Sequence, residues 1–218
     1  MKIGIGVTTY KRKDILDITL SNIHKCTERP FTLYVAEDTD LNRKGISYRK
    51  NECLQNLQTC DYIFLFDDDC YPMLHDWEKF FIKAHQESGE HHFNYLKNNL
   101  HFKKNTAFYS NCSISSYEKC GGVFMSLTAK ALEKVGGFYE GYDTYGFEHI
   151  GFSNRVYNAK LNSDVFLSVD ESEKYLFAFD YEVKGFKSSI SEMEKEHFQE
   201  KNKQFYKQDV LAEYQKIG

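Results

Sequence analysis

Short apolar runs alternate with longer stretches of helical spacing in the first third of the chain. The runs at 3–7, 32–36 and 62–66 have the length and composition of buried strands. Between them, apolar residues three or four positions apart predict helices at about 14–26, with Asp14 as its N-cap, and at about 47–57. The order strand, helix, strand, helix, strand is typical of a doubly wound sheet. We therefore expect an α/β fold with a mostly parallel central sheet flanked by helices.

The pattern becomes less regular further along the chain. Between about 87 and 119, polar and aromatic residues mix without a clear period, which is typical of a binding loop but also fits short strands. A strand is expected at 121–127, and Thr128 is expected to cap a helix that ends before Gly136. From Ile190 onward the sequence is highly charged and helical in composition.

Three consecutive acids, Asp67, Asp68 and Asp69, directly follow the third predicted strand. Because side chains alternate along a strand, Asp67 and Asp69 are expected on one side and Asp68 on the other. Two carboxylates about 4 Å apart repel by about 4 kcal/mol at an effective dielectric near 20, unless a cation or water screens them. A few carboxylates with phosphate oxygens suit Mg²⁺ or Mn²⁺. The triplet is therefore either a divalent-metal site or an acidic turn.

Polar residues also follow the other two predicted strands. Thr8, Thr9 and Tyr10 follow the first strand, and Glu37 and Asp38 follow the second. In parallel sheets, ligands bind beyond the carboxyl ends of the strands, so these side chains are expected to meet the acidic triplet there. The chain has neither the glycine-rich dinucleotide fingerprint nor a Walker motif, so we expect no nicotinamide or flavin cofactor.

Charge and cysteine usage narrow the classes of function. The net charge of −4 and the pI near 6.1 argue against tight non-specific binding of nucleic acid. The chain has 6 cysteines without a C-x-x-C pair, a strand-like N-terminus unlike a signal peptide, and no apolar stretch near membrane length. We therefore expect reduced thiols, no membrane span and a cytoplasmic location.

Four segments, in the right order, resemble the GT-A fold glycosyltransferases that use nucleotide sugars. Residues 3–12 resemble the first strand and its "T-Y-x-R" turn, and 35–38 resemble the second strand with its terminal acid. Residues 65–69 resemble the D-x-D signature, and the segments 136–140 and 146–148 resemble the "G-G-F-D-E … G-x-E-D" stretch of galactosyltransferase-type enzymes. Together these segments span about two thirds of the chain.

The resemblance implies a metal-dependent transferase that moves a sugar from a nucleotide-diphosphate sugar, foremost a UDP-sugar, to an acceptor hydroxyl with inversion. It implies Asp67 and Asp69 as ligands of Mn²⁺ or Mg²⁺, with His197 near the C-terminus completing the metal site. The donor-binding residues that it implies are Thr8, Thr9, Tyr10, Arg12, Asp38, Lys50, Asn51, Asp68 and Gly122. The acceptor is left open among glycan, protein and modified nucleobase.

Glu148 is our candidate general base, which would take the proton of the attacking hydroxyl. The sequence departs from the family at His149, which stands where a second acid is usual. Two alternatives therefore stay open: Glu148 binds the donor sugar while another group is the base, or His149 contributes to the chemistry.

The resemblance also sets the expected domain organisation. We expect a GT-A domain at 1–189, with a nucleotide-binding half at about 1–85 and an acceptor-binding half at about 86–189. A helical segment at 190–218 is expected to pack on it. The alternatives to this function are a nucleotidyltransferase, which predicts a glycine-rich loop that residues 8–13 lack, and a non-catalytic carbohydrate-binding or interaction protein on the same scaffold.

Overall fold

The computed structural model describes residues 1–97, 102–142, 144–186 and 188–217. Within these residues the central sheet has five strands, in the order β2 (Phe31–Asp38), β1 (Ile3–Tyr10), β3 (Tyr62–Asp67), β8 (Phe124–Thr128) and β5 (His92–Asn94). The first three pair in parallel, whereas β8 is antiparallel to both of its neighbours. Four of the five strands therefore run in one direction, which confirms the expected mostly parallel α/β sheet.

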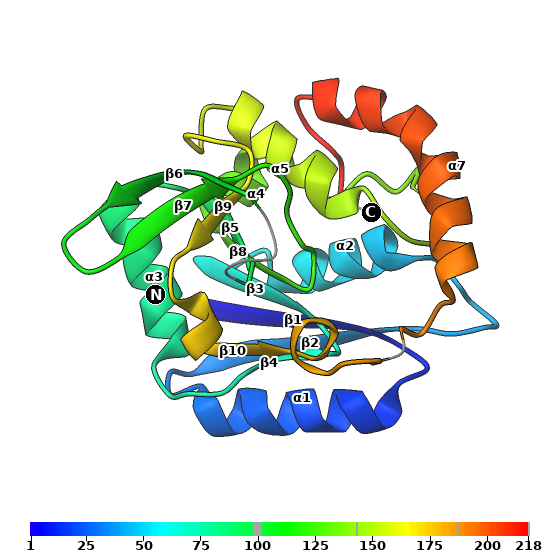
Figure 1. Ribbon diagram of the computed structural model, residues 1–218, viewed down its shortest axis with the longest axis horizontal. Helices are drawn as coiled ribbons and strands as arrows, with labels where there is room; N and C mark the ends of the chain where they lie inside the picture. The colour runs from blue at the N-terminus through cyan, green and yellow to red at the C-terminus, as the bar shows by residue number, and fades with distance from the viewer. Residues whose placement is uncertain (98–101, 143, 187, 218) are drawn as a thin grey trace.

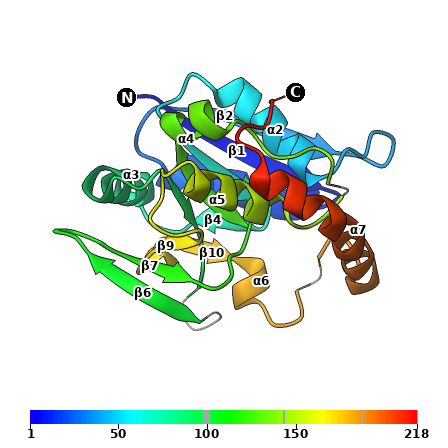
Figure 2. The same ribbon diagram turned by 90° about the horizontal axis from the view of Figure 1, so that it is seen from above.

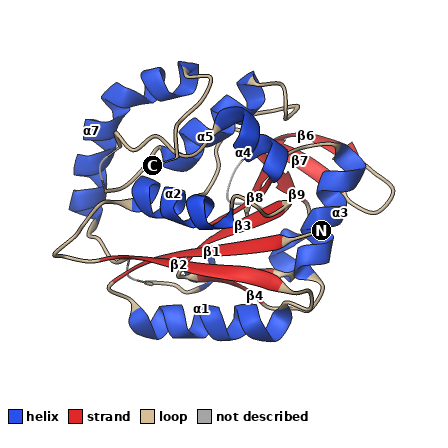
Figure 3. Ribbon diagram, turned by 180° about the vertical axis from the view of Figure 1, so that it is seen from behind, coloured by secondary structure: helices blue, strands red, loops and turns tan. Residues whose placement is uncertain are grey.

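Helices cover both faces of this sheet (Figure 1). One face carries α1, and the opposite face carries α2, α4 and α5, as the view from behind also shows (Figure 3). The C-terminal helix α7 lies beside α5 (Figure 2). The helix bounds are α1 Lys13–Cys26, α2 Ile46–Leu57, α3 Trp77–Ser88, α4 Ala129–Val135, α5 Glu148–Asn158, η1 Ser172–Lys174, α6 Phe179–Glu182 and α7 Glu192–Leu211.

Alternation along β3 divides the apolar core into two layers. Phe64 and Phe66 belong to the layer that packs on α1 and α3, and their rings lie 4.8 and 5.3 Å from Trp77. Ile63 and Leu65 belong to the other layer, under α2, α4 and α5. The run of apolar residues before the acids is continuous because β3 is buried on both faces.

The glycines of β1 allow α2 to approach the sheet closely. A Cβ atom on Gly6 would lie 2.7 Å from Cys53 Cβ and 2.8 Å from Leu65 Cδ2, so no side chain fits there. These glycines serve helix packing and do not form a phosphate loop. Close packing of α2 matters for the site because α2 carries Lys50.

Two small sheets extend the fold beyond the central one. β6 (Lys103–Phe108), β7 (Ser113–Tyr117) and β9 (Leu167–Val169) form one, which resolves the region without clear period in favour of short strands. β4 (Cys70–Pro72) pairs with β10 (Leu176–Ala178) in the other. Because Phe179 N then donates to Asp69 O at 2.9 Å, the chain after β10 lies beside the acidic triplet.

Helix ends follow the predicted signals in part. Thr128 is the N-cap of α4 and accepts from Ala131 N, and Gly136 ends that helix with φ 69°, both as predicted. The predicted cap of α1 at Asp14 is wrong, because α1 begins one residue earlier, after Arg12, and Asp14 lies in its first turn. An acid in that position still interacts favourably with the helix dipole.

A buried polar cluster fastens α7 to α5. Arg155 pairs with Asp209, and both side chains are fully buried. Tyr142 donates to Asp209 Oδ2 at 2.8 Å, and Gly151 leaves room for that carboxylate, which would lie 1.7 Å from an added Cβ. Asn202 of α7 donates to Tyr145 O at 2.9 Å, so α7 also supports the loop before Glu148. None of the described helices is long and apolar enough to cross a membrane.

Candidate functional site

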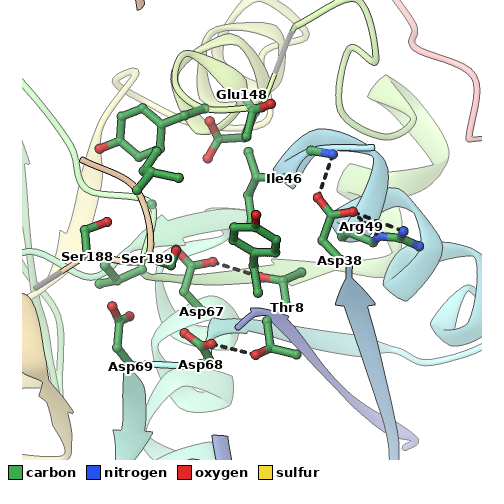
Figure 4. Close-up of a pocket in the computed structure, with 18 of the residues that line it drawn as sticks. Thr8, Asp38, Ile46, Arg49, Asp67, Asp68, Asp69, Glu148, Ser188 and Ser189 are labelled. Carbon is green, nitrogen blue, oxygen red and sulfur yellow. Dashed lines mark hydrogen bonds and ion pairs between the residues drawn. The ribbon is translucent and has the colours of Figure 1, made fainter. Parts of the chain in front are cut away.

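A pocket opens at the carboxyl ends of β1, β2 and β3 (Figure 4). It lies where the sequence predicted a ligand site, because parallel strands bring their ends to one edge of the sheet. The predicted residues that line it are Thr8, Thr9, Tyr10, Arg12, Asp38, Asp67, Asp68, Asp69, Gly122 and Glu148.

Asp67 is the last residue of β3, and it points to the side of the sheet that α2 covers. Thr8 Oγ1 on the neighbouring strand donates to Asp67 Oδ1 at 3.0 Å (Figure 4). Lys50 Nζ lies 3.5 Å from the same oxygen. The Asp67 carboxylate is therefore oriented from two sides, while its side chain keeps 25% of its surface exposed to the pocket.

Asp68 and Asp69 both pair with the guanidinium group of Arg12. β3 ends at Asp67, so the expected alternation does not continue, and Arg12 pairs with Asp68 Oδ1 and, at 2.8 Å, with Asp69 Oδ2. Thr9 Oγ1 donates to Asp68 Oδ2 at 2.6 Å, so both Asp68 oxygens have a partner and the residue is fully buried.

Asp69 keeps one carboxylate oxygen free of protein contacts. Its Oδ1 is buried and has no hydrogen-bond partner among the described residues. Burial raises the pKa of Asp69 to about 7, although Arg12 opposes the shift. A carboxylate held in this way gains from any cation that approaches the free oxygen, because the cation replaces lost solvation.

Lys50 is a buried link between two acids. Its Nζ donates to Gly122 O at 3.0 Å and lies 3.3 Å from Glu148 Oε1, in addition to its contact with Asp67. Burial alone would lower the pKa of Lys50, but Asp67 and Glu148 raise it above its ordinary value. The ammonium group is thus positively charged and joins the end of β3 to the start of α5.

Glu148 begins α5 and pairs with its neighbour in sequence. His149 Nδ1 lies 3.0 Å from Glu148 Oε1, while Glu148 Oε2 has no partner among the described residues. Burial would raise the pKa of Glu148, but His149 and Lys50 hold it well below its ordinary value. For His149 burial acts to lower the pKa, and Glu148 raises it to about 10. Both residues line the pocket, with Glu148 across it from Asp67 (Figure 4).

Asp38 binds its own loop. Its carboxylate accepts from Lys44 N and Gly45 N, each at 2.9 Å, and from the guanidinium of Arg49 at 3.2 Å (Figure 4). This fixes the loop between β2 and α2, whose Arg43 packs over the ring of Tyr10 at 4.5 Å.

Four predicted residues are not among those that line the pocket, and one of them, Glu37, is exposed near the end of β2. Lys50 is buried behind Gly122. Asn51 is buried against the turn that follows α4, where it accepts from Phe138 N at 2.7 Å and donates to Phe138 O at 2.9 Å. His197 is exposed on α7, next to Phe198. The structure therefore does not bring His197 to the aspartates.

Other pocket residues escaped the sequence reasoning. Several of them follow β10, and the pairing of β10 with β4 brings them there: Asp180, Ser188, Ser189, Ile190 and Lys195. No local pattern marks them, because their place depends on a pairing between strands about 100 residues apart. From the first half of the chain, Arg43 and Arg49 also line the pocket, and their basic character in the loop and helix after Asp38 was the available signal.

The acids fit a hard divalent cation. Asp67 and the free oxygen of Asp69 offer the oxygen ligands that Mg²⁺ and Mn²⁺ prefer. Among the described residues, no group of three or more His, Cys, Asp or Glu side chains could hold a metal ion by itself. A cation here would complete its coordination with water and ligand phosphate oxygens, which is the usual arrangement for Mg²⁺.

The chain has the GT-A fold of glycosyltransferases, with its pocket at the carboxyl ends of the parallel strands, as the sequence predicted. Solved structures with that fold superimpose on the chain at 12–15% identity. They include Staphylococcus aureus TarS with UDP, at a TM-score of 0.55, 94% of this chain and 72% of that chain. Another is a variant of Drosophila β1,4-galactosyltransferase 7 with manganese, UDP-Gal and xylobiose. Its TM-score is 0.51, and the match covers 88% of this chain and 78% of that chain. A third is the Pyrobaculum calidifontis mannosyltransferase PcManGT with GDP-Man and Mn²⁺. Its TM-score is 0.54, and the match covers 71% of this chain and 51% of that chain.

The sequence itself is similar to glycosyltransferases. Residues 103–176 match a family described as the N-terminal domain of galactosyltransferase. An uncharacterized glycosyltransferase of Acanthamoeba polyphaga mimivirus is 31% identical over 139 residues, or 61% of this chain. The chain spans 53% of the length of that relative. These likenesses and the fold confirm the resemblance to the GT-A glycosyltransferases that use nucleotide sugars.

Proposed function

We propose that this protein is a metal-dependent glycosyltransferase that transfers a sugar from a UDP-sugar to an acceptor hydroxyl with inversion. The observation that supports it most is the free, buried oxygen of Asp69 beside Asp67, in a GT-A pocket that Glu148 faces from the other side. UDP-Gal and manganese accompany the Drosophila structure, UDP accompanies TarS, and GDP-Man with Mn²⁺ accompanies PcManGT; two of these three nucleotides are uridine nucleotides, and Mn²⁺ occurs in two of the three structures.

In this proposal Asp67 and Asp69 hold the divalent cation. These two residues would hold a cation whose contribution would be to neutralise charge on the departing diphosphate. Thr8 and Lys50 orient Asp67, and Arg12 orients Asp69, so neither carboxylate has to reorganise as the ligand arrives. Thr9, Tyr10, Arg12 and Asp38 border the nucleoside end, and residues 1–85 supply most of the donor site.

Glu148 is the proposed base at the acceptor end. It is ionised, and its free Oε2 is the atom that takes the hydroxyl proton. A low pKa makes a carboxylate a weak base, so His149 and Lys50 have to loosen their hold on Glu148 as the proton arrives. The alternative, in which Glu148 binds the donor sugar, predicts a loss of donor affinity on mutation and no separate effect on turnover.

Nucleotide binding tests the donor and the metal directly. Thermal unfolding with UDP, GDP and CMP, each with and without Mn²⁺, is expected to show stabilisation by UDP only when Mn²⁺ is present. Asp69→Asn should abolish this stabilisation and UDP-sugar turnover. An equal response to all nucleotides, or one independent of metal, would contradict the proposal. Glu148→Gln should reduce turnover by about 100-fold or more while the affinity for the UDP-sugar stays within about twofold.

A further inference from the structure

A buried amide behind the pocket connects two segments of the site. Asn94 on β5 is fully buried, and its Nδ2 donates to Gly121 O at 3.2 Å. Its Oδ1 lies 3.2 Å from Ser153 Oγ on α5. One side chain therefore contacts both the loop that precedes β8 and the helix that begins with Glu148.

Ser153 extends this contact to the start of α5. Its hydroxyl is fully buried and lies 2.8 Å from His149 O and 2.9 Å from His92 Nε2. His92 and Asn94 are two positions apart on β5, so both point to the same face of the strand. His92 Nδ1 in turn lies 3.2 Å from Ser126 O on β8. This face of β5 thus fixes Ser153 against the central sheet.

The connection ends at Gly121 and at His149, and both lie next to residues that take part in the proposed reaction. Gly121 precedes Gly122, whose carbonyl oxygen accepts from Lys50. A Cβ atom on Gly122 would lie 2.8 Å from His149 Nδ1 and 3.3 Å from Glu148 Oε1. The loop and the first turn of α5 are therefore in close contact, and a shift of a few tenths of an ångström between them would move Glu148 relative to Asp67.

We propose that Asn94 and Ser153 are positioning residues, which fix the distance between the Gly121–Gly122 loop and the Glu148–His149 turn. Neither of them lines the pocket, so they act through the backbone that they hold. The inference rests on the proposed function in one respect, namely that Glu148 has to be aimed at the acceptor hydroxyl. Its structural part, the fixed placement of His149, is independent of any activity.

The kinetic test uses Asn94→Leu and Ser153→Ala, with Ser153→Thr as the conservative variant that restores a hydroxyl. We expect turnover of a UDP-sugar to fall by about 10- to 100-fold in the first two, the range for misplacing a catalytic group by up to 1 Å. The Kd for UDP with Mn²⁺ should stay within about twofold, and Ser153→Thr should recover most of the turnover. Because both residues belong to one connection, the double variant should lose little more than either single one.

Ser88→Ala is the matched control. Ser88 Oγ donates to the carbonyl four residues earlier in α3, Ala84 O at 2.6 Å, and Ser153 Oγ lies 2.8 Å from His149 O in the same spacing. It lies outside the pocket, so its variant should keep full turnover. If Asn94→Leu does not fold, Ser153→Ala alone decides, because it removes a single oxygen atom. The proposal would be overturned if the turnover losses of the two single variants add up in the double variant and UDP binding also weakens.

Nuclear magnetic resonance of the His149 ring supplies the readout that needs no activity. In the wild type the Nδ1–H bonded to Glu148 should give a downfield proton signal, assigned by its loss in His149→Gln. That signal should shift or broaden in Asn94→Leu and Ser153→Ala but not in Ser88→Ala. An unchanged signal in folded variants would overturn the inference. A wild type that binds no nucleotide would instead contradict the proposed function and leave this measurement valid.

Discussion

The acids around the pocket are neutralised by basic side chains that are themselves largely buried. Arg12 pairs with two of the aspartates, Lys50 contacts the third and Glu148, and His149 contacts Glu148 from the other side. Removing one partner of a buried pair leaves an uncompensated charge, which costs much more than the pair itself contributes. Substitutions at these positions therefore affect stability as well as any chemistry.

The Glu148–His149 pair predicts a pH dependence of stability. The pKa of His149 is about 10 in the folded chain and near 6.5 when unfolded, so the folded state binds more protons between these values. The stabilisation is complete below pH 6.5 and is lost as the pH rises toward 10, with a slope of up to about 1.4 kcal/mol per pH unit. Urea unfolding from pH 6 to pH 10 should show this loss in the wild type and a flatter profile in His149→Gln. Parallel profiles would refute the assignment.

Lys195 brings a positive charge to the pocket from α7. Its side chain lines the pocket, is 17% exposed, and pairs with Glu192 three residues earlier. If a diphosphate binds there, Lys195→Met should weaken UDP binding by about tenfold and uridine binding much less, as expected for one lost charge-assisted contact. Isothermal titration with Mn²⁺ measures both. Lys203→Met is the control, because Lys203 pairs with Glu200 in the same spacing but lies outside the pocket.

At the scale of elements, the contact between α5 and α7 holds the site together. Arg155 and Asp209 form its buried ion pair, and Gly151 provides the space for the carboxylate. Arg155 also donates to Gly137 O, in the turn that follows α4. The helix that begins with Glu148 is therefore positioned by α7 as much as by the sheet.

Gly151→Ala should reverse the usual sign of a helix substitution. In an open helix, alanine stabilises by about 1 kcal/mol relative to glycine. Here the added Cβ would lie 1.7 Å from Asp209 Oδ2, so we expect a loss of about 1–3 kcal/mol in the free energy of unfolding. Denaturant unfolding measures it. Gly151→Ala should cost much less in an Asp209→Ala background, and equal costs in both backgrounds would refute the steric explanation.

At the scale of the whole molecule, the pocket collects residues from Thr8 to Lys195. A ligand that contacts all of them stabilises the entire fold, by about 2.7 kcal/mol at 100 times its Kd. With UDP and Mn²⁺, hydrogen exchange should therefore slow in residues 8–12, 144–149 and 188–195 together. Protection confined to 8–12 would indicate that the segment after β10 takes no part in binding.

The sequence was sufficient for the features that local physics determines. Patterning and turn chemistry predict the buried strand before Asp67, the helix cap at Thr128 and the alternation of strands and helices up to β3. The structure agrees with all three. Partners that come from distant parts of the chain could not be predicted. Arg12 joins Asp68 to Asp69, Lys50 lies buried beneath Gly122, and the pairing of β10 with β4 brings the later segment to the pocket. Each of these depends on tertiary packing that no local spacing encodes.

The α5–α7 contact also has a consequence for synthesis on the ribosome. Residues 1–160 carry the acidic triplet and Glu148, yet Arg155 lacks its counter-charge until Asp209 has left the exit tunnel. A nascent chain of that length would hold an unpaired guanidinium in an apolar layer, which opposes stable packing of α5. Binding of the proposed nucleotide should therefore begin only once the last turns of α7 have left the tunnel.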